Sequence, residues 1–208
     1  MSARKSNTST PRIVTQPAAD AALETFMYRT RKSLPARIRA GSVALLNQHL
    51  AAAIDLQAQV KQAHWTVRGP GFIAIHELFD RTVTAVAEYA DLIAERTGAI
   101  GGAAEGTVQT AAKSSFLSPY PLRIADTQSH VNAVGEALAA FGASARDAID
   151  RATTLGDADT ADVFTEISRG IDQLLWFVES HVDPVTDTSD RDRQAAETQG
   201  STKTTAAA

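Results

Sequence analysis

Apolar residues recur at three- and four-residue steps through most of this sequence, and such a period favours α-helices over any other element. The clearest stretch, residues 42–68, contains Val43, Leu46, Leu50 and Ile54 and has no Gly or Pro before its end. This spacing places one apolar stripe along a helix. The strand-like alternations elsewhere are too short to compete. We therefore expect a first long helix over residues 42–68.

A second helix is expected over residues 72–97, after the turn Gly69–Gly71. Gly98 is placed where a left-handed residue would stop that helix. The next segment, residues 99–124, is rich in Gly and contains two Pro residues, which indicates a long connection. One short helix near residues 107–113 is expected within it.

Two more helices follow the connection. The third is expected from Asp126, as N-cap, to Arg151, with Gly156 closing that stretch. The fourth is expected to begin at Asp159, as N-cap, and to end near His181, because the proline that follows cannot continue a helix. The sequence thus predicts an all-α fold, a four-helix bundle with one long crossover between its second and third long helices.

The charges divide the chain into three parts. Residues 1–40 carry eight basic and two acidic groups, residues 41–182 nine and seventeen, and residues 183–208 three and five, so the parts have charges of +6, −8 and −2. We interpret residues 1–40 as a basic flexible N-terminal arm and residues 41–182 as the bundle. Residues 183–208 contain no Leu, Ile or Phe and are expected to form a disordered tail. A basic arm on an acidic body is typical of a nucleic-acid tether, whereas the alternative is a solubilising tail.

Composition excludes several classes of site. The chain has no cysteine, so it has no disulfide, thiolate zinc site or catalytic thiol, and any metal must bind nitrogen and oxygen. No apolar run approaches the roughly 20 residues that cross a bilayer, and no secretory signal pattern is present. The Arg/Ser/Thr-rich start has too few aliphatic residues for an amphipathic transit helix. We expect a cytoplasmic protein without a membrane partner.

Four potential metal ligands share one face of the second expected helix. At 100° per residue, Asp80, Asp91 and Glu95 lie about 40°, 60° and 100° from His76. The nineteen residues between His76 and Glu95 span roughly 28 Å along the axis, so one helix cannot bring the four ligands to one metal. A second copy packed antiparallel near residues 85 and 86 would bring His76 and Asp80 of one chain to Asp91 and Glu95 of the other.

His64, near the end of the first helix, can fold back beside His76 and complete a nitrogen and oxygen ligand set. Such a set suits iron, manganese or zinc. Carboxylate ligands that leave coordination positions on the metal open favour redox-active non-haem iron. The alternative is that these groups only form solvated ion pairs, as carboxylates at helical spacing often do. No Glu-x-x-His motif occurs, so an internal di-iron site of the kind found in other bundles is not expected.

A family resemblance rests on residues spread over about 41–182. The sequence is similar to the Dps family, the DNA-binding proteins from starved cells, also called mini-ferritins. The matching residues are Lys61-Gln-Ala-His64-Trp65, Arg68-Gly69, Phe72, His76-Glu77, Asp80, Asp91, Ala94-Glu95-Arg96, Ser118-Pro-Tyr-Pro-Leu, Asp159-Thr-Ala-Asp162 and Leu175-Trp176-Phe177.

The resemblance implies a ferritin-like four-helix subunit in a hollow dodecamer with a ferroxidase site at each two-fold interface. His64, His76 and Asp80 would come from one subunit, and Asp91 and Glu95 from its neighbour. The family oxidises ferrous iron, commonly with hydrogen peroxide and otherwise with dioxygen, and stores the ferric mineral. Trp65 adjoins a ligand and is a candidate oxidisable neighbour, although an aromatic on a helix more often packs.

Three functions therefore compete. The first is iron oxidation and storage that protects DNA, with non-specific DNA binding by the arm and an association with the nucleoid. The alternative is a nucleoid-compacting protein whose metal site is secondary or idle, and the third is a structural bundle. Phe26, Met27 and Tyr28 also allow the arm to dock on the shell. Asp157, Asp159 and Asp162 either draw cations inward or cap the last helix.

Overall fold

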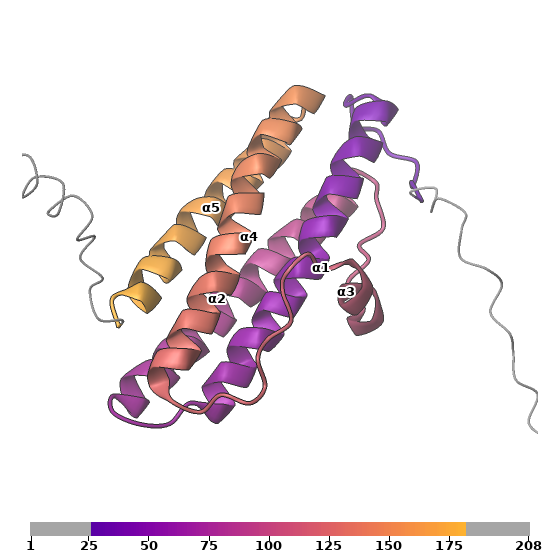
Figure 1. Cartoon of the computed structure of the whole chain (residues 1–208). Coiled ribbons are helices and arrows are strands. Elements are labelled where there is room, and N and C mark those ends of the chain that lie inside the picture. The colour runs from indigo at the N-terminus through magenta and orange to yellow at the C-terminus, as the bar shows by residue number, and fades with distance from the viewer. Residues whose placement is uncertain (1–25, 182–208) are drawn as a thin grey trace, which may run out of the picture.

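Four long helices and one short helix make up the part of the chain that the computed structural model describes, residues 26–181 (Figure 1). The expected C-terminal tail and residues 1–25 of the expected arm lie outside the described residues. In chain order the helices are α1 (Ala36–Thr66), α2 (Phe72–Ala99), α3 (Val108–Ser114), α4 (Thr127–Leu155) and α5 (Ala158–Glu179). No strand forms within residues 26–181, so the all-α fold is confirmed.

Short turns join α1 to α2 and α4 to α5, at opposite ends of the bundle (Figure 1). The connection from α2 to α4 runs back along the bundle and contains α3, which lies beside α1. The predicted crossover and its short helix are thus confirmed. Because of this crossover, the start of α4 lies at the end where α1 meets α2, and Arg68 and Asp126 form a parallel backbone bridge there.

Side chains of α1 fix the crossover in place. Asn47 donates a hydrogen bond to the Ala103 carbonyl and accepts one from the Glu105 N–H, at 3.0 and 3.1 Å. Gln59 donates to the Ser118 carbonyl at 3.0 Å. These bonds satisfy backbone groups that a non-helical segment cannot pair within itself.

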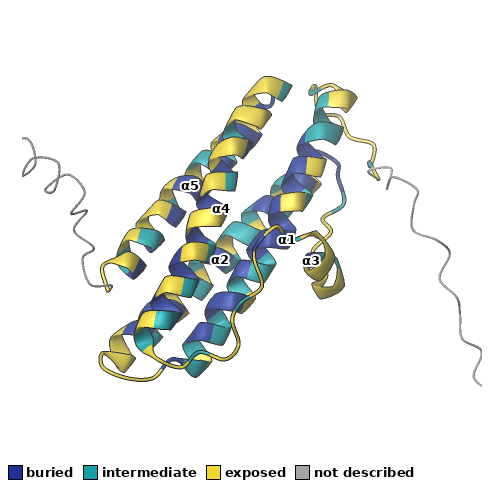
Figure 2. Cartoon of the chain, viewed as in Figure 1, coloured by how far each residue is buried: buried dark blue, intermediate teal, exposed yellow. Residues whose placement is uncertain are grey.

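The core lies where the apolar faces of the four long helices meet, and it excludes water (Figure 2). Its largest side chains include Phe79, Phe141 and Phe164, none of which has any exposed area. His49 is also buried: its Nδ1 donates to the Leu45 carbonyl at 2.8 Å, and its Nε2 accepts from the Ser144 hydroxyl at 3.0 Å. Burial holds the pKa of His49 below its ordinary value, so this histidine is neutral at pH 7.

Helix α1 begins at Ala36, six residues before the predicted start. Pro35 precedes its first residue, and a proline can begin a helix because the first N–H groups have no partner in any case. Gly41 does not interrupt α1; a Cβ there would lie 3.0 Å from a Leu155 methyl, so the glycine lets α1 approach the end of α4. Residues 36–40, assigned to the arm by sequence, therefore belong to the bundle.

The predicted stop of α2 at Gly98 is wrong. The helix continues through Gly98 to Ala99, and the left-handed residue is Gly101, with φ of 86°. The segment before α1 contacts this turn: the Tyr28 N–H donates to the Gly101 carbonyl at 2.7 Å, and Met27 forms a backbone bridge with Gly102.

The predicted N-cap Asp126 and the left-handed Gly156 after α4 are confirmed. No helix in residues 26–181 is both long and apolar enough to span a membrane.

Gly102 is packed too tightly for any side chain. A Cβ at this position would overlap the methyl groups of Val43, which is itself fully buried. Gly102→Ala should lower the free energy of unfolding by about 1–3 kcal/mol, measured by denaturant titration, as other overpacked cores do. The matched control is Gly98→Ala, where nothing lies within 4 Å and a helical alanine should be neutral or stabilising. Equal stability of the two variants would contradict this packing argument.

Candidate metal centre

Two histidines face each other across the turn between α1 and α2. His64 lies in the last turn of α1 and His76 in the first turns of α2, and Gly69 and Gly71 adopt positive φ between them. The two rings stack with centroids 3.7 Å apart. The tight turn therefore brings together two imidazoles that are twelve residues apart in sequence.

Each histidine holds the other by one backbone hydrogen bond. His64 Nδ1 lies 2.9 Å from the His76 carbonyl, and His76 Nδ1 lies 2.9 Å from the His64 carbonyl. A carbonyl only accepts, so both Nδ1 atoms carry the proton and donate. In a neutral imidazole held in this way, Nε2 carries the lone pair that binds a metal. We refer to this pair of bonds as the histidine clamp.

Asp80 lies one turn beyond His76 on α2 and close to His64. Its Oδ1 is 3.9 Å from His64 Nδ1 and 2.5 Å from Lys61 Nζ. The hydrogen bond from Lys61 holds the pKa of Asp80 below its ordinary value, so the carboxylate is ionised at neutral pH. Sequence reasoning missed this role of Lys61, although its position one turn before His64 was a usable signal.

Asp91 and Glu95 are exposed on the same helix but further along its axis. The structure therefore brings His64, His76 and Asp80 together and leaves Asp91 and Glu95 apart from them. Within residues 26–181 no cluster of three or more His, Asp or Glu side chains is arranged to hold a metal ion. A complete ligand set would need groups from another chain.

Aromatic residues border the histidine clamp. The Phe72 ring lies 5.0 Å from the His76 ring and packs against it at a tilt. Trp65 is 66% exposed, so it does not fill the core of its own subunit. The packing role considered for Trp65 is therefore not met within one chain.

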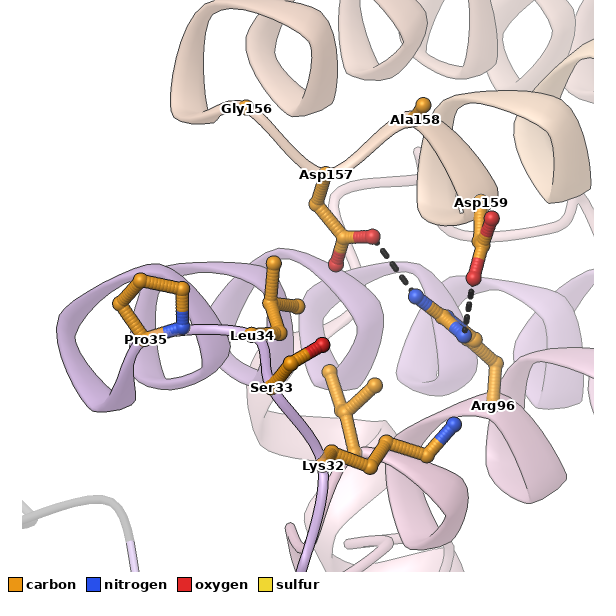
Figure 3. Close-up of a pocket in the computed structure, with 10 residues that line it drawn as sticks. Lys32, Ser33, Leu34, Pro35, Arg96, Gly156, Asp157, Ala158 and Asp159 are labelled. Carbon is orange, nitrogen blue, oxygen red and sulfur yellow. Dashed lines mark hydrogen bonds and ion pairs between the residues drawn. The ribbon is translucent and has the colours of Figure 1, made fainter.

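The three acids at the start of α5 are not a free cluster. Asp157, not the predicted Asp159, is the N-cap of α5, and it accepts hydrogen bonds from the Thr160 N–H and hydroxyl. Asp157 is also ion-paired with Arg96 of α2 at 2.6 Å, and Arg96 reaches Asp159 at 3.4 Å (Figure 3). Asp162 is exposed one turn further along the helix. Asp157 is thus engaged in capping and pairing, and only Asp159 and Asp162 present carboxylates to solvent.

This ion pair forms one wall of a cavity of about 460 Å³ at the end of the bundle (Figure 3). Lys32 and its neighbours up to Pro35 form the opposite wall. Burial alone would raise the pKa of Asp157, but the Ser42 hydroxyl, the bonds from Thr160 and the charge of Arg96 together lower it. Arg96 thus ties the end of α2 to the start of α5.

Comparisons with known proteins agree with this architecture. Residues 43–186 match the ferritin family model, described as a ferritin-like domain. The chain is 40% identical to the DNA protection during starvation protein of Agrobacterium fabrum over 155 residues, which cover 74% of this chain and 96% of that one. DpsA14 from Streptomyces coelicolor superposes with a TM-score of 0.73 at 30% identity, over 78% of this chain and 96% of that one. Dps from Microbacterium arborescens in the high iron form gives 0.66 at 34% identity, over 71% and 95%.

The fold and these matches define a ferritin-like protein. Within that class, the chain belongs to the Dps family. Its four long helices with a crossover agree with this assignment.

The Arg96–Asp157 pair generates a stability prediction. Asp157→Asn should lower the free energy of unfolding by about 3 kcal/mol at pH 7, because it leaves a largely buried guanidinium without its anion. The folded-state pKa of Asp157 lies below the unfolded value near 4, so the native state binds fewer protons and this stabilisation exists above that value. The difference between wild type and variant should therefore shrink as pH falls from 5 towards 3, measured by denaturant titration. Asp162→Asn is the matched control and should change stability little. A constant difference across that pH range would contradict the pairing.

Proposed function

We propose that the chain oxidises ferrous iron at sites shared between two subunits and stores the ferric product inside a dodecameric shell, which protects DNA from iron-driven oxidation. The histidine clamp is the observation that carries this proposal. It fixes both imidazoles through their Nδ1 atoms, which leaves each Nε2 free to bind a metal, close to Asp80 and at the start of a helix face that also bears Asp91 and Glu95. Membership of a ferritin-like family supports the choice of iron over other metals.

The second half of the ligand set comes from a neighbouring copy. Two α2 helices packed antiparallel around a two-fold axis bring His64, His76 and Asp80 of one subunit to Asp91 and Glu95 of the other. Val86, at the level of this axis, is fully buried in its own subunit, so the helices would meet through other residues at that level. Thr84 and Ala87 lie on the ligand-bearing face and are small enough for close approach.

Each group has a definite task in the reaction. The imidazole nitrogens and carboxylates bind ferrous iron, and the carboxylates favour the ferric product because harder cations prefer oxygen. Two ferrous ions each give one electron, and one hydrogen peroxide takes both as its O–O bond breaks to the level of water. No hydroxyl radical leaves when the electrons are paired in this way. Dioxygen is the other candidate oxidant, and Trp65 is an oxidisable group next to His64.

Lys61 must release Asp80 when iron binds. The Lys61 and Asp80 side chains are 32% and 54% exposed, so their ion pair adds little to the stability of the fold. A divalent cation can therefore displace the Lys61 ammonium from Asp80. The resulting site keeps the fixed histidines and frees the carboxylate only when the metal arrives.

We expect His76→Ala together with Glu95→Ala to lower the rate of ferrous oxidation by at least about 100-fold, because each change removes a direct metal ligand. Loss of a residue that only hydrogen-bonds to a ligand already lowers metal affinity or activity by about 10- to 100-fold. The measurement is peroxide consumption with ferrous iron under anaerobic conditions. Glu136→Ala, an exposed acid on α4, is the matched control and should keep the wild-type rate. Wild-type activity in the assembled double variant would exclude this site.

We also propose that the basic N-terminal segment binds duplex DNA without sequence preference, which would place the protein at the nucleoid in the cytoplasm. The bundle is acidic, so DNA contact must come from the basic segment. Twelve copies would add weak contacts together where several reach the duplex at once. Residues 36–40 start α1 and cannot be removed without harming the fold.

Deleting residues 1–25 removes Arg4, Lys5 and Arg12 and should weaken binding, with the slope of log affinity against log salt reduced by about three. Gel retardation at several salt concentrations measures this. Deleting residues 185–208 should preserve or strengthen binding, because that segment is net acidic. Unchanged salt dependence after the N-terminal deletion would rule out these contacts.

Peroxide consumption and gel retardation together also distinguish the proposed function from the alternative, a DNA-compacting protein with an idle metal site. That protein would retard DNA and consume no peroxide, whereas a plain structural bundle would do neither.

A further inference from the structure

The segment before α1 lies fixed across the end of the bundle, opposite the histidine clamp. We call residues 26–35 the strap. Its backbone is held by the Tyr28 N–H bond to Gly101 and by the Met27 bridge to Gly102, and the Met27 side chain packs against the core. Arg39 adds two bonds from α1, to the carbonyls of Leu34 and Ile100, at 3.2 and 3.0 Å. The strap is therefore docked on its own subunit.

Two aromatic rings on the strap face solvent. Phe26 and Tyr28 are 62% and 57% exposed, and their ring centroids are 4.8 Å apart in an edge-to-face arrangement. They flank Met27, and the alternation of an extended backbone directs Met27 inward and the two rings outward. Exposed aromatic rings that share one surface mark a site of interaction more often than a packing defect.

Cationic residues follow these rings closely in the sequence. Arg29, Arg31, Lys32 and Arg37 are all exposed, and residues 25–54 contain no acidic residue. Of the two acids that line the cavity with Lys32, Asp157 is buried and paired with Arg96, whereas Asp159 is only loosely held at 3.4 Å and stays exposed. The strap is thus a strongly positive surface with open aromatic faces, on a body of net charge −8.

We propose that the strap binds single-stranded nucleic acid, with unpaired bases stacked on Phe26 and Tyr28 and phosphates held by Arg29, Arg31 and Lys32. Aromatic faces beside cations bind unpaired bases of any sequence, because every base has a π-face. Bases in a duplex are already stacked on one another and offer such rings nothing without unpairing. Stacking on the strap would therefore make the protein prefer single strands over duplexes. Contacts to phosphates alone would not give this preference.

The test measures anisotropy of labelled oligo(dT) and oligo(U) of about 20 nucleotides, and of a duplex of equal length, with the full-length assembled protein. Phe26→Ala with Tyr28→Ala should weaken single-strand binding by about tenfold or more and change duplex binding by less than about twofold. Phe26→Trp with Tyr28→Trp should restore binding, and the added oligomer should quench the new tryptophan fluorescence. Leu122→Ala, an equally exposed apolar residue away from the strap, is the matched control.

Charge variants give an independent readout. Arg29→Gln with Arg31→Gln should weaken single-strand binding and reduce its salt slope by about one. Unchanged single-strand affinity in either double variant would overturn the proposal. So would an equal loss on both nucleic acids in the aromatic variant, or a drop in native mass showing that the rings pack against a neighbouring copy. Ferrous oxidation should be unchanged in all strap variants, so this proposal and the iron proposal can fail separately.

Discussion

Helices α1 and α2 are joined by only five residues, 67–71, and this short turn forces them to pack antiparallel over most of their length. Two glycines with positive φ make the turn possible. Every other feature follows from the pairing. It places His64 over His76, lets each hold the other through a carbonyl, and exposes the rest of the α2 ligand face along one side of the subunit. It also leaves α4 and α5 to cover the opposite side, where Phe141 and Phe164 enter the core.

The two ends of the bundle have different chemistry. The end with the α1–α2 turn carries two imidazoles and a carboxylate, groups that suit a cation. The other end carries the strap, the Arg96–Asp157 pair and a row of exposed arginines, which suit a polyanion. Because the two ends are separated along the length of the helices, the proposed iron chemistry and the proposed nucleic-acid contact would use different groups of the same subunit.

Local rules predicted most of the fold. The apolar period located four long helices, and Asp126 and Gly156 cap α4 as their side-chain chemistry predicts. The errors arose at helix ends where a contact with a residue distant in sequence contributes to the local conformation. Helix α2 continues past Gly98 to Ala99, and its chain reverses at Gly101 and Gly102, where the strap docks; Asp157 caps α5 through Thr160 and is held as well by Arg96 on another helix. Neither the strap nor Arg96 lies within a local sequence window around these positions.

The candidate site was predictable in part for the same reason. Helical spacing placed four ligands on one face of α2, and the glycine turn indicated that His64 would join them. Two features depend on side-chain geometry and appear only in the structure. They are the hydrogen bonds that orient both imidazoles and the ion pair between Lys61 and Asp80. Asp91 and Glu95 lie apart from the histidines along α2, so they would complete the site only from a second chain.

Hybrid shells test the shared site most directly. One variant carries His64→Ala and His76→Ala and the other carries Asp91→Ala and Glu95→Ala, so neither can build a site alone. Co-assembled and confirmed by native mass at about 265 kDa, twelve chains of 22.1 kDa, they should regain part of the ferrous oxidation rate. A mixed interface joins intact His64, His76 and Asp80 from one chain to intact Asp91 and Glu95 from the other. Hybrid shells as inactive as either parent would contradict a site shared between subunits.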